Sequence, residues 1–259
     1  MNALLNRVYC SYFMPSRLGW YEEFVFLACN AGYRQTSVRL FYKASRSVQC
    51  PDEKIIVHRH DIDTDVRTAR KLFEIEKKYN IKSSYYFRIS TLDFDFMREI
   101  EEYGSEASYH YEEIATFAKR NHIKDPAEIW KRLPEIRDEF LANFNLVEER
   151  LGKKMTTVAS HGDFANRSLK LPNTEILNDQ KLRERCGIEC ESYDQALLGN
   201  FDIYIADRPP PQYYYPTSPF SAIGSYNKIF FLTHPVQWET NWIENTKSNF
   251  LRLYEKFRW

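Results

Sequence analysis

Hydrophobic and polar positions repeat along the chain with two periods, and these predict helices and strands that follow one another. The clearest helix spans 126–151, where Pro126 suits the first turn, Pro134 could introduce a kink and Gly152 ends the pattern. Its apolar side chains step by three or four residues: Ile129, Leu133, Ile136, Phe140, Phe144, Val147 and Leu151. Further helices are expected at 18–33, after an N-cap at Thr64, at 94–103, near 175–185 and at 238–257.

Short apolar or aromatic runs lie between these helices and predict strands. We expect them at 37–42, 55–60, 82–90, 105–111, 156–160, 203–206 and 228–233, with a long loop at 209–225. Strands that alternate with helices favour a largely parallel sheet, either closed or open. In such folds the chemistry is carried by the loops that follow the strands.

The length and composition of the chain indicate one globular domain. The chain has 259 residues, 43% of them hydrophobic, which suffices for a single large core, and no linker divides it. We therefore expect one domain over 1–259, in which 1–50 form an N-terminal helix and strand extension. The 36 basic and 36 acidic residues give zero net charge, so the chain as a whole has no electrostatic footprint for nucleic acid or an anionic membrane.

The cysteines and the apolar runs bear on location. Five scattered cysteines argue against a disulfide framework, and Cys186 and Cys190, four residues apart, are interpreted as buried thiols rather than half of a zinc site. No run resembles a signal peptide or a transmembrane helix. These features predict a cytoplasmic protein.

Histidine and aspartate gather where four predicted strands end, in the segments 59–63, 106–110, 159–163 and 232–235. Side chains of a strand alternate between its two faces, so Arg59, Asp61 and Asp63 share one face of their strand. If this face and the face of the other strand that carries His110 both point inward, the two carboxylates and the imidazole lie in one cleft. Two carboxylates and an imidazole that converge in one cleft would bind Zn, Fe, Co or Mn. Each residue also has a simpler interpretation, since Asp63 or Thr64 could cap the next helix.

Three of these segments resemble the motifs of the polysaccharide deacetylase superfamily, in the same order over about residues 55 to 240. The run 56–63 resembles the first motif, whose first Asp is the general base and whose second binds metal, and this implies these roles for Asp61 and Asp63. The run 104–111 resembles the second motif and implies that His110 is a ligand. The run 232–234 resembles the last motif and implies that His234 is the general acid. The resemblance further implies a distorted (β/α) barrel of about seven parallel strands.

One position departs from the family pattern. The second metal histidine of the family falls four residues after the first, and this chain has Ile114 there. We expect His161 to supply the missing ligand from the next strand end, although it could instead bind substrate or pack. If nothing replaces the ligand, the chain is a metal-free relative.

Three other residues are candidates for support of the site. Asp207 could orient His234 or Arg59, or cap a turn before Pro209. Arg59 could pair with Asp61 and keep it ionised. Trp238, like the tyrosines of 213–215, could stack on a sugar ring or simply pack.

The residues and the resemblance together predict metal-dependent hydrolysis of an N-acyl group, N-acetyl in the first instance, on a sugar. Zinc is favoured over cobalt, manganese and nickel. A nucleotide- or lipid-linked saccharide of bacterial surface polysaccharide biosynthesis, such as that of lipopolysaccharide O-antigen, is the expected substrate. The alternatives are a carbohydrate-binding relative without catalysis and a metal-independent amidase of the same fold.

Overall fold

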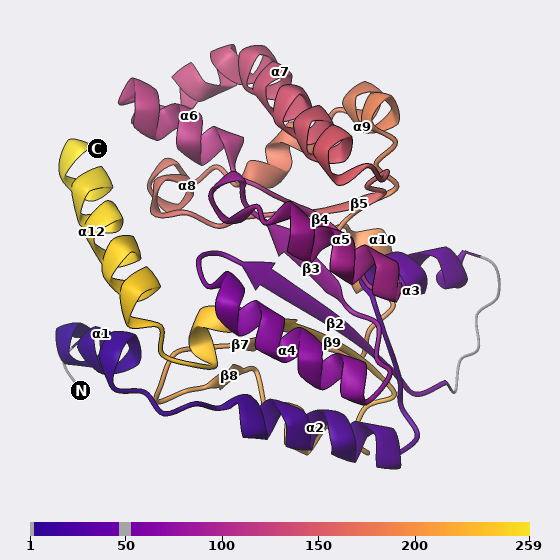
Figure 1. Ribbon diagram of the computed structural model, residues 1–259. Helices are drawn as coiled ribbons and strands as arrows, with labels where there is room; N and C mark the ends of the chain where they lie inside the picture. Colours follow the sequence, from indigo (N-terminus) through magenta and orange to yellow (C-terminus); the bar gives the residue numbers. More distant parts are fainter. Residues whose placement is uncertain (1–2, 47–52) are drawn as a thin grey trace.

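A single mostly parallel sheet forms the centre of the protein in a computed structural model that describes residues 3–46 and 53–259 (Figure 1). Its strands run in the order β6-β5-β4-β3-β2-β9-β7-β8, and β1 also pairs with β2. Among the described residues only β8 is antiparallel to its neighbour. The strands are β1 (Arg34–Thr36), β2 (Ile55–Ile62), β3 (Ser84–Phe87), β4 (Glu106–Tyr111), β5 (Thr157–Ser160), β6 (Cys190–Glu191), β7 (Ile203–Asp207), β8 (Tyr214–Tyr215) and β9 (Lys228–Thr233).

The sheet curls but does not close. Within the part of the chain that the structure describes, β6 and β8 end the strand order and do not pair with each other. The expected barrel of about seven parallel strands is therefore corrected to an open half-barrel of nine strands. The predicted parallel pairing is confirmed. It arises because the helix of each βα unit returns the chain to the end of the sheet where the preceding strand began.

The two largest apolar clusters lie on one face of the sheet, the outer face of its curl, and helices cover that face (Figure 1). One apolar cluster packs α4 to α7 and α9 against β3 and β4, and a second packs α2 and α4 against β2 and β9. The bounds are α1 (Ala3–Tyr12), α2 (Leu18–Asn30), α3 (Val38–Ser45), α4 (Val66–Lys78), α5 (Phe94–Tyr103), α6 (Glu113–Asn121), α7 (Pro126–Leu151), α8 (Phe164–Leu169), α9 (Gln180–Cys186), α10 (Gln195–Leu198), α11 (Pro219–Ala222) and α12 (Trp242–Arg258), with short 3₁₀ turns at Ile89–Thr91, Asn173–Asn178 and Pro235–Gln237.

Two local predictions are wrong for identifiable reasons. The segment 37–42 is not a strand but the start of α3, because the Ser37 hydroxyl accepts a hydrogen bond from the Leu40 amide and caps a helix. Val38 and Phe41, three residues apart, are the buried pair of that helix. Thr64 is likewise not the cap of α4, since the Asp65 carboxylate accepts from the Thr68 amide.

Other expectations are confirmed. Helices α5 and α7 have the predicted extents and end at Gly104 and Gly152, both at positive φ. Cys186 and Cys190 are buried free thiols, and burial raises the pKa of Cys186 to about 11. Cys50 lies outside the described residues. Across residues 3–46 and 53–259, the helices all fall short of the length and apolar character needed to span a bilayer.

Strand β2 carries different chemistry on its two faces. Arg59 and Asp61 point into the curl of the sheet, while His58 and His60 point outward to a polar network around Glu76 of α4. Glu76 accepts hydrogen bonds from Tyr21 (2.6 Å), His60 (2.7 Å), Tyr85 (2.5 Å) and Ser83. Burial alone would raise the pKa of Glu76, but the nearby imidazoles, His60 foremost, and these donors lower it to about 2.

The same network could be mistaken for a metal site, because His58, His60 and Glu76 offer ligand atoms close together. Both ring nitrogens of each histidine already have a protein partner: His58 contacts Tyr21 and Gln35, and His60 contacts Thr233 and Glu76. We therefore interpret the cluster as a buried hydrogen-bond network that joins α2, α4, β2 and β9.

Candidate active site

Arg59 and Asp61 form a buried bidentate ion pair at the end of β2. The Arg59 Nε and Nη2 donate to the two Asp61 oxygens at 2.8 and 2.7 Å, and the exposed fractions of the two side chains are 0% and 2%. Burial raises the pKa of Asp61, but the Arg59 guanidinium, together with His110 and His234, lowers it by more, so the net pKa lies below the ordinary value. Asp61 is thus held as a carboxylate that can accept a proton.

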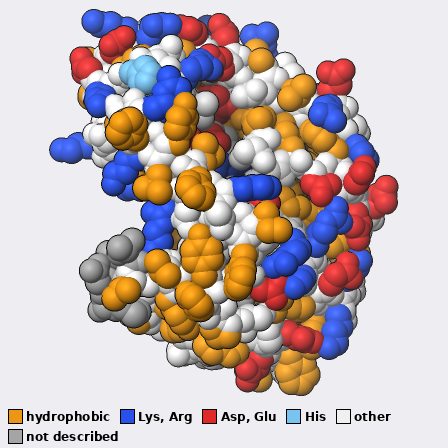
Figure 2. Space-filling model, turned by 60° about the vertical axis from the view of Figure 1, so that its left-hand side comes forward, with side chains coloured by type: hydrophobic (Ala, Val, Ile, Leu, Met, Phe, Trp, Pro, Cys, Tyr) orange, Lys and Arg blue, Asp and Glu red, His pale blue; other side chains and the backbone are white. Residues whose placement is uncertain are grey.

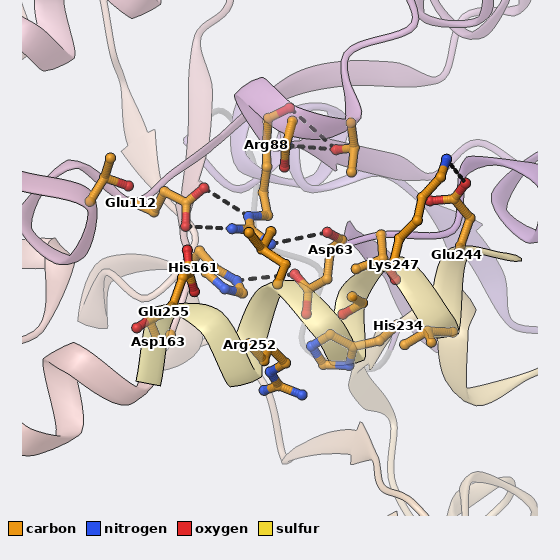
Figure 3. A pocket seen from close by; sticks show the side chains of 18 of the residues that line it. Asp63, Arg88, Glu112, His161, Asp163, His234, Glu244, Lys247, Arg252 and Glu255 are labelled. Carbon is orange, nitrogen blue, oxygen red and sulfur yellow. Dashed lines mark hydrogen bonds and ion pairs between the residues drawn. The ribbon is translucent and has the colours of Figure 1, made fainter. Parts of the chain in front are cut away.

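Asp63, His110 and His161 converge from three strand ends, those of β2, β4 and β5. Asp63 Oδ1 lies 3.1 Å from His161 Nδ1 (Figure 3) and 3.3 Å from His110 Nε2, and the two ring nitrogens are 3.3 Å apart. Strand β3 separates β2 from β4, so the curl of the sheet is what brings Asp63 to His110. The Asn173 amide fixes the loop of His161 by donating to its carbonyl oxygen at 2.6 Å.

The hydrogen bonding and the spacing of these three ligand atoms fit a metal ion. His110 Nδ1 lies 2.9 Å from the Ala159 carbonyl oxygen and donates to it, which leaves the Nε2 lone pair free in the neutral ring. Asp63 Oδ1 is buried and accepts no hydrogen bond, although both imidazoles are near. Tetrahedral bonds of about 2.0–2.1 Å place two ligand atoms about 3.3 Å apart, close to the spacing found here.

The charges of the site point the same way. Burial opposes ionisation of Asp63, yet the imidazoles, His161 first among them, bring its pKa well below the ordinary value. Asp61 also approaches the set, with Oδ2 at 3.4 Å from His110 Nε2. One carboxylate and two imidazoles form a donor set suited to Zn or a similar transition metal.

Ile114 lies away from this centre. It is fully buried on α6 in the apolar cluster between the sheet and α7, so the family's second histidine position contributes nothing to the site of this chain. His161 occupies the space that a third ligand requires. The structure therefore brings together the three residues that the sequence analysis selected for metal binding.

Asp207 orients His234 from the neighbouring strand. Asp207 Oδ1 lies 2.6 Å from His234 Nδ1, while Oδ2 accepts from the His234 amide at 2.7 Å and from Trp238 Nε1 at 2.9 Å. Burial would lower the pKa of His234, but the charge and the hydrogen bond of Asp207, with Asp63 and Asp61, overcome this and raise it to about 9. His234 is therefore cationic at neutral pH, with Nε2–H as the proton that remains free.

Trp238 has a different role from the one expected. Its ring is 1% exposed and packs edge-on against Tyr21, so it cannot stack on a sugar in the cleft. It acts instead on Asp207 through the indole N–H. Asp207 was expected to orient either His234 or Arg59, and in the structure it contacts His234.

Asp63, His161, Asp207 and His234 line one cleft of about 1560 Å³. Figure 3 shows Asp63, His161 and His234 facing it, with side chains of α12 such as Lys247 and Arg252 on its wall. A second hollow of about 470 Å³ adjoins His161, between Ser160 and Tyr193.

Two lining residues were missed from the sequence. Arg88 donates to both Glu112 oxygens at 2.9 and 2.7 Å and to the Asp63 carbonyl at 3.1 Å (Figure 3). Arg88 directly follows β3 and Glu112 directly follows β4. A search of strand ends for every charged residue, rather than for His and Asp alone, would have found them.

We expect Asp207→Asn to lower the pKa of His234 from about 9 toward its ordinary value of about 6.5, because the compensating charge is lost. NMR titration of the imidazole, with His234→Gln to identify its resonance, measures this. Since the folded pKa exceeds the unfolded one, the pair stabilises the fold fully below about pH 6.5, and this contribution disappears as pH rises through about 9. A midpoint that stays near 9 in Asp207→Asn would contradict the assignment.

Comparison with known proteins adds one distant likeness. No protein-family model matches the chain, and neither does any curated protein sequence. Among solved structures, the chain is similar to Streptococcus pyogenes deacetylase PplD in complex with acetate, with a TM-score of 0.41 and 14% identity over 59% of this chain and 68% of PplD. The interpretation of the site therefore rests on its geometry and on the motifs themselves.

Proposed function

We propose that the protein is a metal-dependent hydrolase that removes an N-acyl group, N-acetyl in the first instance, from a sugar. The observation that carries the proposal is the placement of three ligand atoms 3.1–3.3 Å apart in a cleft that also holds a cationic histidine. A carboxylate base, a metal and an imidazolium acid are the parts of metal-assisted amide hydrolysis.

Each residue has a distinct task in this proposal. Asp63, His110 and His161 would hold a divalent transition metal, with zinc favoured over cobalt, manganese and nickel, which supplies a water of lowered pKa and a polarised acyl carbonyl. Asp61, kept ionised by Arg59, takes the proton of the attacking water. His234 donates its Nε2 proton to the leaving amine, because an amide anion leaves poorly, and Asp207 stabilises the imidazolium before that transfer.

The cleft supports a saccharide of some length. Its volume of about 1560 Å³ exceeds the roughly 300–1000 Å³ of most small-molecule sites, and its wall mixes charged and polar side chains. We propose a nucleotide- or lipid-linked precursor of a bacterial surface polysaccharide as substrate, and the cytoplasm as its location.

One observation favours a second function. Ile114 stands where the family has its second metal-binding histidine, and its side chain cannot bind a metal. This is expected in a carbohydrate-binding relative that has lost its metal and its catalysis. The two proposals differ in whether His161 serves as the third ligand.

Metal content separates them. Wild-type protein supplied with Zn, Co, Mn or Ni is expected to hold one equivalent, and His110→Ala and His161→Ala should each weaken binding by at least about 100-fold, because each removes one of three protein ligands. Elemental analysis and competition with a chelator measure this. The control is His122→Asn, at an exposed helix end, which should bind as the wild type does.

Two results would revise the proposal. Wild-type protein that takes up none of the four metals would overturn the metal mechanism and leave the binding relative or a metal-independent amidase. Full affinity in His161→Ala alone would give His161 another role and leave Asp63 and His110 as the ligands.

A further inference from the structure

Helix α12 turns its apolar side chains outward. Most of its large apolar residues are more than half exposed: Trp242 (65%), Ile243 (69%), Phe250 (69%), Leu251 (55%), Leu253 (62%), Tyr254 (56%) and Phe257 (91%). The structure describes every residue of α12, and the one buried residue in this helix is the polar Asn245. A helix on the surface of a globular protein normally shows the reverse arrangement.

The periodicity of the helix makes this a continuous surface. With about 100° per residue, six of these residues fall within one arc of about 120°, which we name the α12 outer face: Trp242, Ile243, Phe250, Leu253, Tyr254 and Phe257. The opposite arc holds Glu244, Asn245, Ser248, Asn249, Arg252 and Glu255, and these residues line the cleft or contact α1. The helix is thus amphipathic, with its polar side toward the active site.

Helix α1 extends the exposed apolar area. It lies beside α12 and is fastened to it by Arg7 on Asn249 and by Asn245 on the Ser11 carbonyl (Figure 1). Leu5 is 61% exposed, and Phe13, just after α1, is 68% exposed. Figure 2 brings this side of the molecule forward and shows apolar side chains mixed with Lys and Arg around a notch.

We propose that the α12 outer face, together with α1, binds the surface of a bilayer that contains anionic lipids. Apolar residues that include Trp and Tyr, in a helix whose exposed charges are basic, are the features of helices that lie in the membrane interface. Lys247, Lys256 and Arg258 are exposed and fall just outside the two edges of the α12 outer face, whereas both acids of α12, Glu244 and Glu255, are half-buried and paired with lysines.

The charge of the helix decides between a bilayer and a second copy of this chain. Four basic and two acidic residues give α12 a net charge of +2, while the whole chain is neutral. Two copies of the face would bring like charges together, whereas anionic lipid complements them. A helix of 17 residues is shorter than the roughly 20 needed to span a bilayer, so it would lie on the surface.

Docking in this way would place the cleft at the interface, because α12 is a wall of the cleft and its other side would contact lipid. This consequence rests on the proposed function: of the two substrate forms considered, it favours the lipid-linked saccharide. The docking itself does not depend on the chemistry.

Co-sedimentation of the full chain with vesicles of phosphatidylcholine, with or without phosphatidylglycerol, tests the proposal. Wild-type protein should pellet with the anionic vesicles, and Phe250→Ser combined with Phe257→Ser should lower the partition coefficient about 100-fold, or about tenfold per phenylalanine. Lys256→Glu should weaken binding to the anionic vesicles about tenfold or more and leave binding to pure phosphatidylcholine unchanged. Because these side chains are exposed, circular dichroism should show an unchanged fold.

The matched control is Leu146→Ser, which removes an apolar residue that is 43% exposed on α7, away from α12 (Figure 1), and should bind as the wild type does. Wild-type protein that stays in the supernatant with both kinds of vesicle would overturn the proposal. So would a wild-type dimer in light scattering that the double variant turns into a monomer without vesicle binding, since that assigns the face to a second copy. Vesicle binding without turnover of any acylated sugar would overturn the proposed function alone.

Discussion

Replacement of His234 by alanine should lower kcat on an N-acylated sugar by about 10²- to 10⁴-fold, with little change in substrate affinity. The reason is that His234 acts on the leaving amine, and this interaction exists in the transition state rather than in the bound substrate. Its pKa of about 9 means that the proton is present at neutral pH before the reaction begins. Amine release measured beside calorimetric binding separates the two quantities.

The control for this variant is His122→Asn, and metal content must remain that of the wild type in both. An equal loss of binding and turnover would indicate that His234 contacts the sugar in the ground state. Binding in the wild type without turnover on any acylated sugar would move the assignment to the non-catalytic relative.

Glu76→Ala should lower the free energy of unfolding by about 3–5 kcal/mol, a large part of the stability of a domain. The change leaves Tyr21, His60, Ser83 and Tyr85 without their shared acceptor in a site where each is buried. Denaturation with urea, followed by far-UV circular dichroism, measures the loss.

Glu74→Ala on the same helix is the matched control, because Glu74 is 61% exposed and, among the described residues, forms its ion pair with Lys77. Its effect should stay within about 0.5 kcal/mol. If the two variants were equally stable, the network around Glu76 would contribute no more than a surface ion pair does.

The residues brought together in the site were accessible from sequence because strand periodicity is strict. Once β2 is placed, alternation assigns Arg59 and Asp61 to one face and His58 and His60 to the other, and the structure has this arrangement. Parallel strands then collect their ends at one edge, which brings Asp63 to His110 and His161. The metal and the catalytic roles remain predictions.

The errors arise where a short signal was assigned the wrong period or where contacts come from distant segments. Val38, Phe41 and Tyr42 have strand propensity, but burial of Val38 and Phe41 three residues apart is helical, and the Ser37 cap begins that helix. Glu76 was missed although it follows Ala69, Leu72 and Phe73 on the apolar side of α4, where a charge calls for a partner. Closure of the barrel depends on pairing between the first and last strands of the sheet, which no local pattern encodes.

Strand β2 has two partners along one edge, β1 beside its first half and β3 beside its second, with β9 along the other edge. This arrangement makes the strand intolerant of length changes. An insertion of one residue between Val57 and Asp61 would move every following side chain of the strand to the opposite face of the sheet. An imidazole would then enter the cleft, and a carboxylate would pack against α4. Insertions of a single residue in this strand should therefore be lost from any library selected for folded protein, whereas comparable insertions at the exposed turn 211–212, between β7 and β8, should survive.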